Sequence, residues 1–262
     1  MEPVDYHVEA VGRRGINLVT RSGGMALLAG RFVGTLKDIP RSMHLIIEQF
    51  YTIGVRSLPL IIVISVFVGA VSAWQAAYQF KFIGAPLRLL GSAVGKAVVI
   101  ELAPVLSALV FAGRVGAGIA AELGTMRVTE QIDALESLGI DPVRYLVLPR
   151  MLACIVMVPM LVIFANFIAV MGALAVSMFG VDISSETFLN GYRASFQVSD
   201  FLNGMIKAGV FGLLIGLVGC YEGMTTVGGA EGVGRATTIS VVISSVFILI
   251  FNFFFAVLLF RI

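Results

Sequence analysis

The stretch that decides the fold is ELGTMRVTEQIDALESLGID, residues Glu122–Asp141. It is the longest densely charged run in a chain that is otherwise very apolar, and long apolar runs stand on both sides of it. A run with this many charges cannot lie in hydrocarbon. We therefore expect a loop on the water side of a membrane, between two membrane-spanning helices.

The same stretch carries the signals of a short helix. Thr129 is the predicted N-cap, and Gly139 and Pro142 are expected to end the helix. Two sets of residues would each share a face at a spacing of three: Ile132, Leu135 and Leu138 on an apolar face, and Glu130, Asp133 and Glu136 on an acidic one. Two interpretations stay open: an amphipathic helix on the membrane surface, or a helix presented to a soluble partner.

Composition places the whole chain in a membrane. It is 58% hydrophobic and only 13% charged, with a mean hydropathy of +0.99, whereas soluble domains carry about 25% charged residues. The net charge of +2 and the scattered basic residues argue against nucleic acid as a partner. Cys154 and Cys220 both lie in apolar runs, so we expect buried thiols and no disulfide framework.

The chain divides into two parts. Residues 1–56 mix bases with apolar side chains and lack the apolar core of a signal peptide, which favours an N-terminal amphipathic helix in the cytoplasmic interface; a poorly ordered basic tail is the alternative. Residues 57–262 predict an all-α membrane domain of five transmembrane helices. The expected spans are 57–80, 89–111, 151–179, 201–221 and 236–260, separated by a turn near Gly84, the charged connection 113–150, a polar loop at 182–200 and a glycine-rich loop at 222–235.

The distribution of Lys and Arg sets the predicted orientation. With the N-terminus inside, the cytoplasmic side holds two thirds of the 18 basic residues. The positive-inside rule then favours N-in and C-out. This topology places the Glu122–Asp141 loop in the cytoplasm.

Glu101 is the most informative single residue. A carboxylate within a span costs roughly 2.5–3.5 kcal/mol on insertion scales, so it should face a cavity or a partner. It either bonds to a neighbouring helix, lies close enough to the interface to be wet, or lines a binding cavity; Lys96 is too far round the helix to pair with it. Trp74, with Gln75 and Tyr78, forms either an interfacial aromatic belt or the mouth of such a cavity.

Several kinds of site are absent from the sequence. Gly91–Ala97 only approximates a phosphate-binding loop, and no Walker A motif occurs, so ATP must be bound by another subunit if it is used. His7 and His44 are the only histidines; they offer neither a metal site nor a catalytic triad. We therefore expect no enzyme activity and no cofactor on this chain. A stand-alone secondary transporter with Glu101 as its proton site is an alternative, although no internal repeat is visible.

Three stretches carry a resemblance to a known family. AGRVGAGIAAELGTMRVTEQIDALESLGIDPVRYLVLPR (Ala112–Arg150), ELAPVLSALVFAGR (Glu101–Arg114) and GVGRATTISVV (Gly232–Val242) closely resemble the MlaE (YrbE) family. Its members are permease subunits of bacterial ABC transporters that move phospholipid between the membranes of the envelope. The resemblance extends from about Glu48 to the C-terminus.

The resemblance implies a multi-pass permease in the bacterial inner membrane. Its partners would be an ABC ATPase, which holds the ATP and Mg²⁺, a periplasmic MCE-domain protein, phospholipid and a second copy of the chain. A glutamate at the position of Glu101 would line a lipid pocket between the two copies, with Trp74, Gln75 and Tyr78 added here as pocket residues. Some relatives carry an arginine where this chain has Ile100. The loop at about 122–141 would be the coupling helix that docks on the ATPase, through Glu122, Thr125, Arg127, Thr129, Glu130, Asp133, Leu135 and Glu136.

Overall fold

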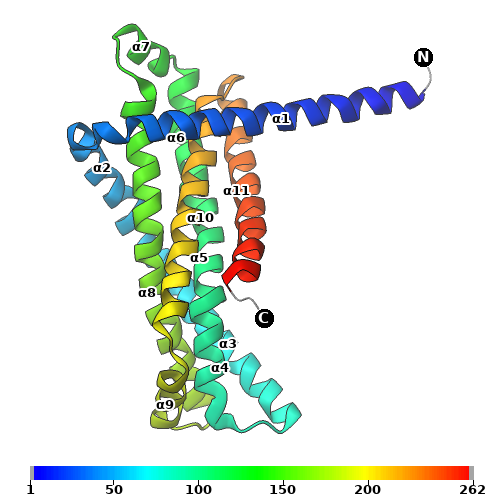
Figure 1. Ribbon diagram of the computed structural model, residues 1–262, viewed down its shortest axis with the longest axis vertical. Coiled ribbons are helices and arrows are strands. Elements are labelled where there is room, and N and C mark those ends of the chain that lie inside the picture. Colours follow the sequence, from blue (N-terminus) through cyan, green and yellow to red (C-terminus); the bar gives the residue numbers. More distant parts are fainter. Residues whose placement is uncertain (1–2, 260–262) are drawn as a thin grey trace.

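The computed structural model describes the backbone of residues 3–259 and the side chains of residues 19–258 (Figure 1). Within this part of the chain every regular element is a helix, and five helical segments are long and apolar enough to cross a membrane. The predicted all-α fold with five spans is therefore confirmed. The side chain of His7 and the predicted end of the last span at Phe260 lie outside the described residues.

The elements follow one another with short connections. In chain order they are α1 (Pro3–Thr35), η1 (Leu36–Ser42), α2 (Met43–Gln49), η2 (Phe50–Gly54), η3 (Val55–Ser57), α3 (Leu58–Ile83), η4 (Leu87–Leu89), α4 (Leu90–Ala97), η5 (Val98–Leu102), α5 (Ala103–Phe111), η6 (Ala112–Gly116), α6 (Ala117–Val128), α7 (Gln131–Ser137), η7 (Val143–Val147), α8 (Leu148–Gly180), α9 (Ser185–Ser195), α10 (Val198–Met224) and α11 (Gly229–Leu259).

The spans form an elongated bundle with different elements at its two ends. α1 crosses one end, where α7 also projects, and α9 lies at the opposite end (Figure 1). α1 packs on the bundle through one buried face that includes Met25, Leu28 and Phe32, spaced as one side of a helix. Its N-terminal half extends past α11 (Figure 1). The structure thus has an N-terminal helix ahead of the spans; its place in the cytoplasmic interface stays a prediction.

Small residues bring the spans into backbone contact. A Cβ built on Gly69 of α3 would lie 1.8 Å from the Ala169 carbonyl oxygen of α8, and one on Gly212 of α10 would lie 2.3 Å from that of Cys154. Between apolar helices in lipid, such close approach supplies van der Waals contact that larger residues would prevent. Cys154 and Cys220 are fully buried free thiols, as expected.

The second span is longer than predicted. The helix continues through η6 and α6 to Val128, so the segment between the two long helices shortens to residues 129–142 around α7. Glycine has a weak helix propensity, but tertiary packing overrides it at positions 113, 116 and 118. Gly219 and Gly223 of α10 lie close to the backbone of α6, and Leu123 of α6 is fully buried.

Two predicted loops are also largely helical. Residues 182–200 contain α9, which begins where the Ser184 hydroxyl accepts the Thr187 N–H at 3.3 Å and which buries Phe188. The glycine-rich loop reduces to residues 225–228, because α10 runs to Met224 and α11 begins at Gly229. Gly232 packs directly on the Val227 carbonyl oxygen, so this glycine serves close packing inside a helix.

Candidate functional site

Residues 129–142, the α7 hairpin, project from the end of the bundle where α1 lies (Figure 1). The predicted N-cap at Thr129 is wrong: Thr129 ends α6, and its hydroxyl donates to the Thr125 carbonyl oxygen at 2.8 Å. Glu130 precedes α7 with φ +59°, in the left-handed region. The chain must reverse within two residues between α6 and α7, and one left-handed residue makes that reversal possible.

The other end of α7 follows the prediction. Gly139 has φ +74° and donates its N–H to the Glu136 carbonyl oxygen at 2.9 Å, and the Ile140 N–H reaches the Leu135 carbonyl oxygen at 3.0 Å. This is the paired hydrogen bonding of a Schellman-type helix end. The hairpin therefore has a defined shape at its tip.

The faces of α7 are divided between the bundle and water. Ile132 is buried and Leu135 is partly buried against the core, whereas Leu138 is 75% exposed, so the apolar face is shorter than predicted. The acidic residues point away from the core: Glu130, Asp133 and Glu136 are all exposed. The Arg127 guanidinium donates to the Asp133 carboxylate and closes the hairpin on itself.

An ion pair fixes the base of the hairpin. The Arg150 guanidinium at the start of α8 is buried; it lies 2.8 Å from the Glu122 carboxylate of α6 and donates to the Leu146 carbonyl oxygen at 2.9 Å. Thr125 and Thr129 line a cleft of about 280 Å³ with Ala230 and Val233 of α11. The Glu122–Arg150 pair thus ties α6 to α8 at the base of the hairpin.

Glu101 lies in a polar network inside the apolar bundle. It belongs to η5, a π-helical turn, and such turns are frequent at functional positions. The Lys207 ammonium of α10 lies 2.9 Å from the Glu101 Oε2, and the Asn252 side-chain amide of α11 donates to Oε1. The ammonium also donates to the Ile100 carbonyl oxygen at 3.4 Å and to the Asn252 Oδ1 at 3.3 Å.

The two charges of this network differ in exposure. The Lys207 side chain is fully buried, whereas the Glu101 side chain is 41% exposed in the single chain. An unpaired ammonium at that position would be very costly, so the network compensates the burial of Lys207. The Glu101 carboxylate therefore stays partly exposed, beside the Asn252 amide, in otherwise apolar surroundings. Such a group can bind a polar headgroup or a second polar surface.

Lys207 is the partner of Glu101 that sequence reasoning missed. Its signal was present: a single basic residue within the fourth span, opposite in sign to the acid in the second. Intramembrane charges pair with one another, so these two are natural partners. The prediction that Lys96 does not pair with Glu101 agrees with the structure, where Lys96 lies 3.8 Å from Asp200.

Trp74 and Tyr78 are 58% and 66% exposed, and Gln75 is exposed as well. The Trp74 ring packs against Gly180 of α8 and lines a shallow cleft of about 350 Å³ with Phe179. Glu101 instead contacts α10 and α11. Grouping these aromatic residues with Glu101 in one pocket stays a prediction.

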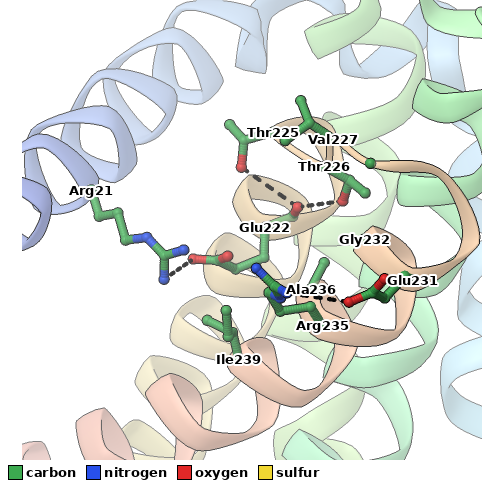
Figure 2. A pocket seen from close by; sticks show the side chains of 11 residues that line it. Arg21, Glu222, Thr225, Thr226, Val227, Glu231, Gly232, Arg235, Ala236 and Ile239 are labelled. Carbon is green, nitrogen blue, oxygen red and sulfur yellow. Dashed lines mark hydrogen bonds and ion pairs between the residues drawn. The ribbon is translucent and has the colours of Figure 1, made fainter.

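A second polar cluster lies where α1 meets the ends of α10 and α11 (Figure 2). The Arg21 side chain reaches from α1 to the buried Glu222 carboxylate at 3.6 Å, and Arg235 lies 3.4 Å from Glu231. Gly24 packs against the Tyr221 ring next to this pair. The cluster surrounds a cavity of about 310 Å³ and attaches the interfacial helix to the spans.

Comparison with known proteins decides the family. The family described as "Permease MlaE" matches residues 46–258. The chain belongs to the MlaE permease family. It is 41% identical over 253 residues to a probable ABC transporter permease protein of Rickettsia felis, which covers 97% of each chain. It is 43% identical over 215 residues to one of Synechocystis, covering 82% of this chain and 81% of the relative.

A third relative extends the range of organisms. A probable ABC transporter permease protein of Pyropia yezoensis is 38% identical over 216 residues, covering 81% of this chain and 80% of the relative. The resemblance of the Ala112–Arg150 region is thus confirmed at the level of the family. The matched region of this MlaE-family permease contains both the α7 hairpin and the Glu101–Lys207–Asn252 network.

Proposed function

We propose that this MlaE-family permease is the membrane-spanning subunit of an ABC transporter that moves phospholipid between the inner and outer membranes. The observation that carries the proposal is the partly open carboxylate of Glu101, held by Lys207 and Asn252 within an apolar bundle. A polar edge maintained in hydrocarbon suits an amphiphilic cargo, whose headgroup needs polar contacts and whose chains need an apolar wall.

The α7 hairpin is the proposed docking element for the ATPase. Its acidic face is exposed, its ends are defined by Glu130 and Gly139, and its base is held by the Glu122–Arg150 pair. A partner that pushes on a hairpin so fixed would move α6 and α8 with it. ATP hydrolysis belongs to that partner in this proposal, because the chain has no Walker A motif.

The remaining partners follow from the family and from the surface of the chain. In the most apolar 18-residue stretch of the last span, α11, only 11% is buried inside the chain, which leaves a large apolar face for lipid or for a second copy. We propose a homodimer with the lipid pocket between its copies, and a periplasmic MCE-domain protein that exchanges lipid with it. The excess of basic residues on the α7 side supports placing that side in the cytoplasm.

The docking proposal is tested by charge reversal at the hairpin. Affinity purification of the chain from host membranes in mild detergent should recover an ATPase. Glu130→Lys/Asp133→Lys should release that ATPase while the permease stays in the membrane. The matched control is Glu186→Lys, an exposed acid on α9 at the other end of the bundle. Retention of the ATPase by the hairpin variant would refute the docking site.

The lipid proposal is tested independently. A photo-crosslinking amino acid at position 101 should capture phospholipid in intact membranes, and the same group at the exposed Phe254 of α11 serves as the control for bulk lipid. The amount of phospholipid captured at position 101 should exceed the amount captured at the control position. It should fall when ATP is supplied, because transport then empties the site. Capture of protein neighbours alone would refute a lipid-lined site at Glu101.

A further inference from the structure

The cavity of about 400 Å³ between the N-terminal segment and the loop after α7 borders the α7 hairpin at Gly139, but none of the exposed acidic residues proposed for ATPase docking lines it. One wall is formed by η1 and α2, including Arg41 and His44, and the other by residues that follow α7, including Asp141 and Arg144. The walls come from segments about one hundred residues apart in sequence. Both segments lie at the α7 end of the bundle (Figure 1).

The charges in the cavity favour an anion. Arg144 is half-buried, and within the described residues neither an ion pair nor a hydrogen bond engages its guanidinium. Arg41 is exposed; it lies 3.7 Å from Asp38, a surface pair of the kind that contributes little. The Asp141 carboxylate already accepts the Val143 N–H at 3.0 Å. The two guanidinium groups on opposite walls outnumber the one carboxylate, Asp141, so the cavity carries a net positive charge that suits a phosphate group.

An apolar stripe runs from the cavity toward the first span. Met43, Ile47, Tyr51 and Val55 recur at every fourth position along α2, η2 and η3, immediately after the cavity residues Arg41 and Ser42. Their exposed fractions are 47%, 59%, 56% and 47%, so about half of each side chain is left open by the described residues, and the Arg56 guanidinium lies 5.7 Å from the centre of the Tyr51 ring. The stripe leads into α3, the first transmembrane helix.

From this combination we propose that the cavity binds the phosphate of an anionic phospholipid headgroup, with the acyl chains along the Met43–Val55 stripe. A soluble protein partner would meet the guanidinium groups but would leave the adjoining apolar stripe to lipid. An amphiphile satisfies both surfaces at once, since anionic headgroups are attracted to bases at the membrane surface. The lipid is held at the side of the bundle, away from Glu101, so it is a bound component and distinct from the transported cargo.

The test uses the full chain purified in detergent and titrated with phosphatidylglycerol, with bound lipid counted by native mass spectrometry. Arg41→Gln/Arg144→Gln should weaken phosphatidylglycerol binding by about tenfold, as expected for losing two charge-assisted contacts. Arg31→Gln removes an exposed base from α1 on the same side without touching the cavity, and it should leave binding unchanged. Phosphatidylcholine, which carries no net charge, should bind weakly to all three proteins.

Each other outcome has a definite meaning. Equal phosphatidylglycerol binding by the double variant and the unaltered chain would overturn the proposal, as would an equal loss in the Arg31→Gln control. If inorganic phosphate binds in a way that depends on Arg41 and Arg144, without any preference for the lipid, the site belongs to free phosphate and the proposal of a bound phospholipid is overturned. Loss of ATPase association with unchanged lipid binding would show that the cavity is a protein contact instead.

Discussion

The pairing of Glu101 with Lys207 predicts how stability changes across four proteins: the unaltered chain, Glu101→Gln, Lys207→Met and the double variant. Glu101→Gln leaves the fully buried Lys207 ammonium without its counter-charge. Breaking a buried pair from one side costs about 3–5 kcal/mol. Because the Glu101 side chain is 41% exposed, water already screens part of the interaction, and we reduce the expected loss to about 2 kcal/mol. For a chain of this size that corresponds to a fall in Tm of roughly 4–8 °C.

The double variant distinguishes pairing from mere proximity. Glu101→Gln/Lys207→Met removes both charges and fills the Lys207 site with an apolar side chain of similar length. It should therefore lose less stability than the two single variants together, with a coupling free energy of about 1 kcal/mol or more. Thermal unfolding in nanodiscs, followed by tryptophan fluorescence of Trp74, measures all four proteins of the cycle.

A second cycle with Lys96→Met provides the control. Lys96 is also basic and also close to a carboxylate, but that carboxylate is Asp200, and the Lys96 side chain is 45% exposed. Glu101→Gln and Lys96→Met should be additive. Additivity in the Lys207 cycle as well would refute the reasoning, because it would mean that the two charges do not stabilise one another.

Three further predictions concern other parts of the molecule. Gly212→Val should reduce the yield of folded, detergent-soluble protein, because its Cβ would lie 2.3 Å from the Cys154 carbonyl oxygen; Gly234→Ala, with nothing within 4 Å, should be neutral in the same assay. Gly139 has φ +74°, so Gly139→Ala should destabilise the end of α7 by about 1–2 kcal/mol and weaken ATPase co-purification. Gly118→Ala, where an added Cβ would meet no atom within 4 Å, should retain the ATPase. Arg150→Gln should lower the unfolding free energy by about 1.5–3 kcal/mol and be partly rescued by Glu122→Gln, as measured by thermal unfolding, since the two side chains are 2.8 Å apart; absence of rescue would contradict a base held by that pair.

The spans were predictable because their signal is composition over a long window. Loss of charge over more than twenty residues leaves few alternatives to a membrane helix. The ends of the spans were less predictable. The second span was predicted to end near residue 111, but in the structure the helix continues through the glycines at 113, 116 and 118, because α10 packs against this stretch with glycines of its own. That partner lies about one hundred residues away in sequence, so no local pattern reports it.

The site shows the same division between local and distant information. Gly139 was correctly placed at the end of α7, because a helix end depends on neighbouring residues alone. Thr129 was misplaced, since the sharp reversal at Glu130 is imposed by how α6 and α7 attach to the bundle. Glu101 could be singled out from its cost in hydrocarbon, and the opposite charge of Lys207 in another span was a usable signal, whereas the contact with Asn252 required the three-dimensional structure.

The helical run from Leu87 to Val128 connects the two parts of the proposed mechanism. It carries Glu101 about one third of the way along and Glu122 near its α7 end, a separation of about 30 Å at 1.5 Å per residue. Two π-helical turns, η5 and η6, interrupt the run; the first holds Glu101, and the second holds Arg114, which donates to Ser57. A π turn carries a looser hydrogen-bond pattern than the α-helix around it, so these are the points at which the run can change register.

Movement of the hairpin would therefore reach Glu101 as a rotation or shift of one turn. Because Glu101 is bonded to α10 and α11, that shift must alter its contacts with Lys207 and Asn252. Such a difference in contacts between two states is what a coupled lipid site requires.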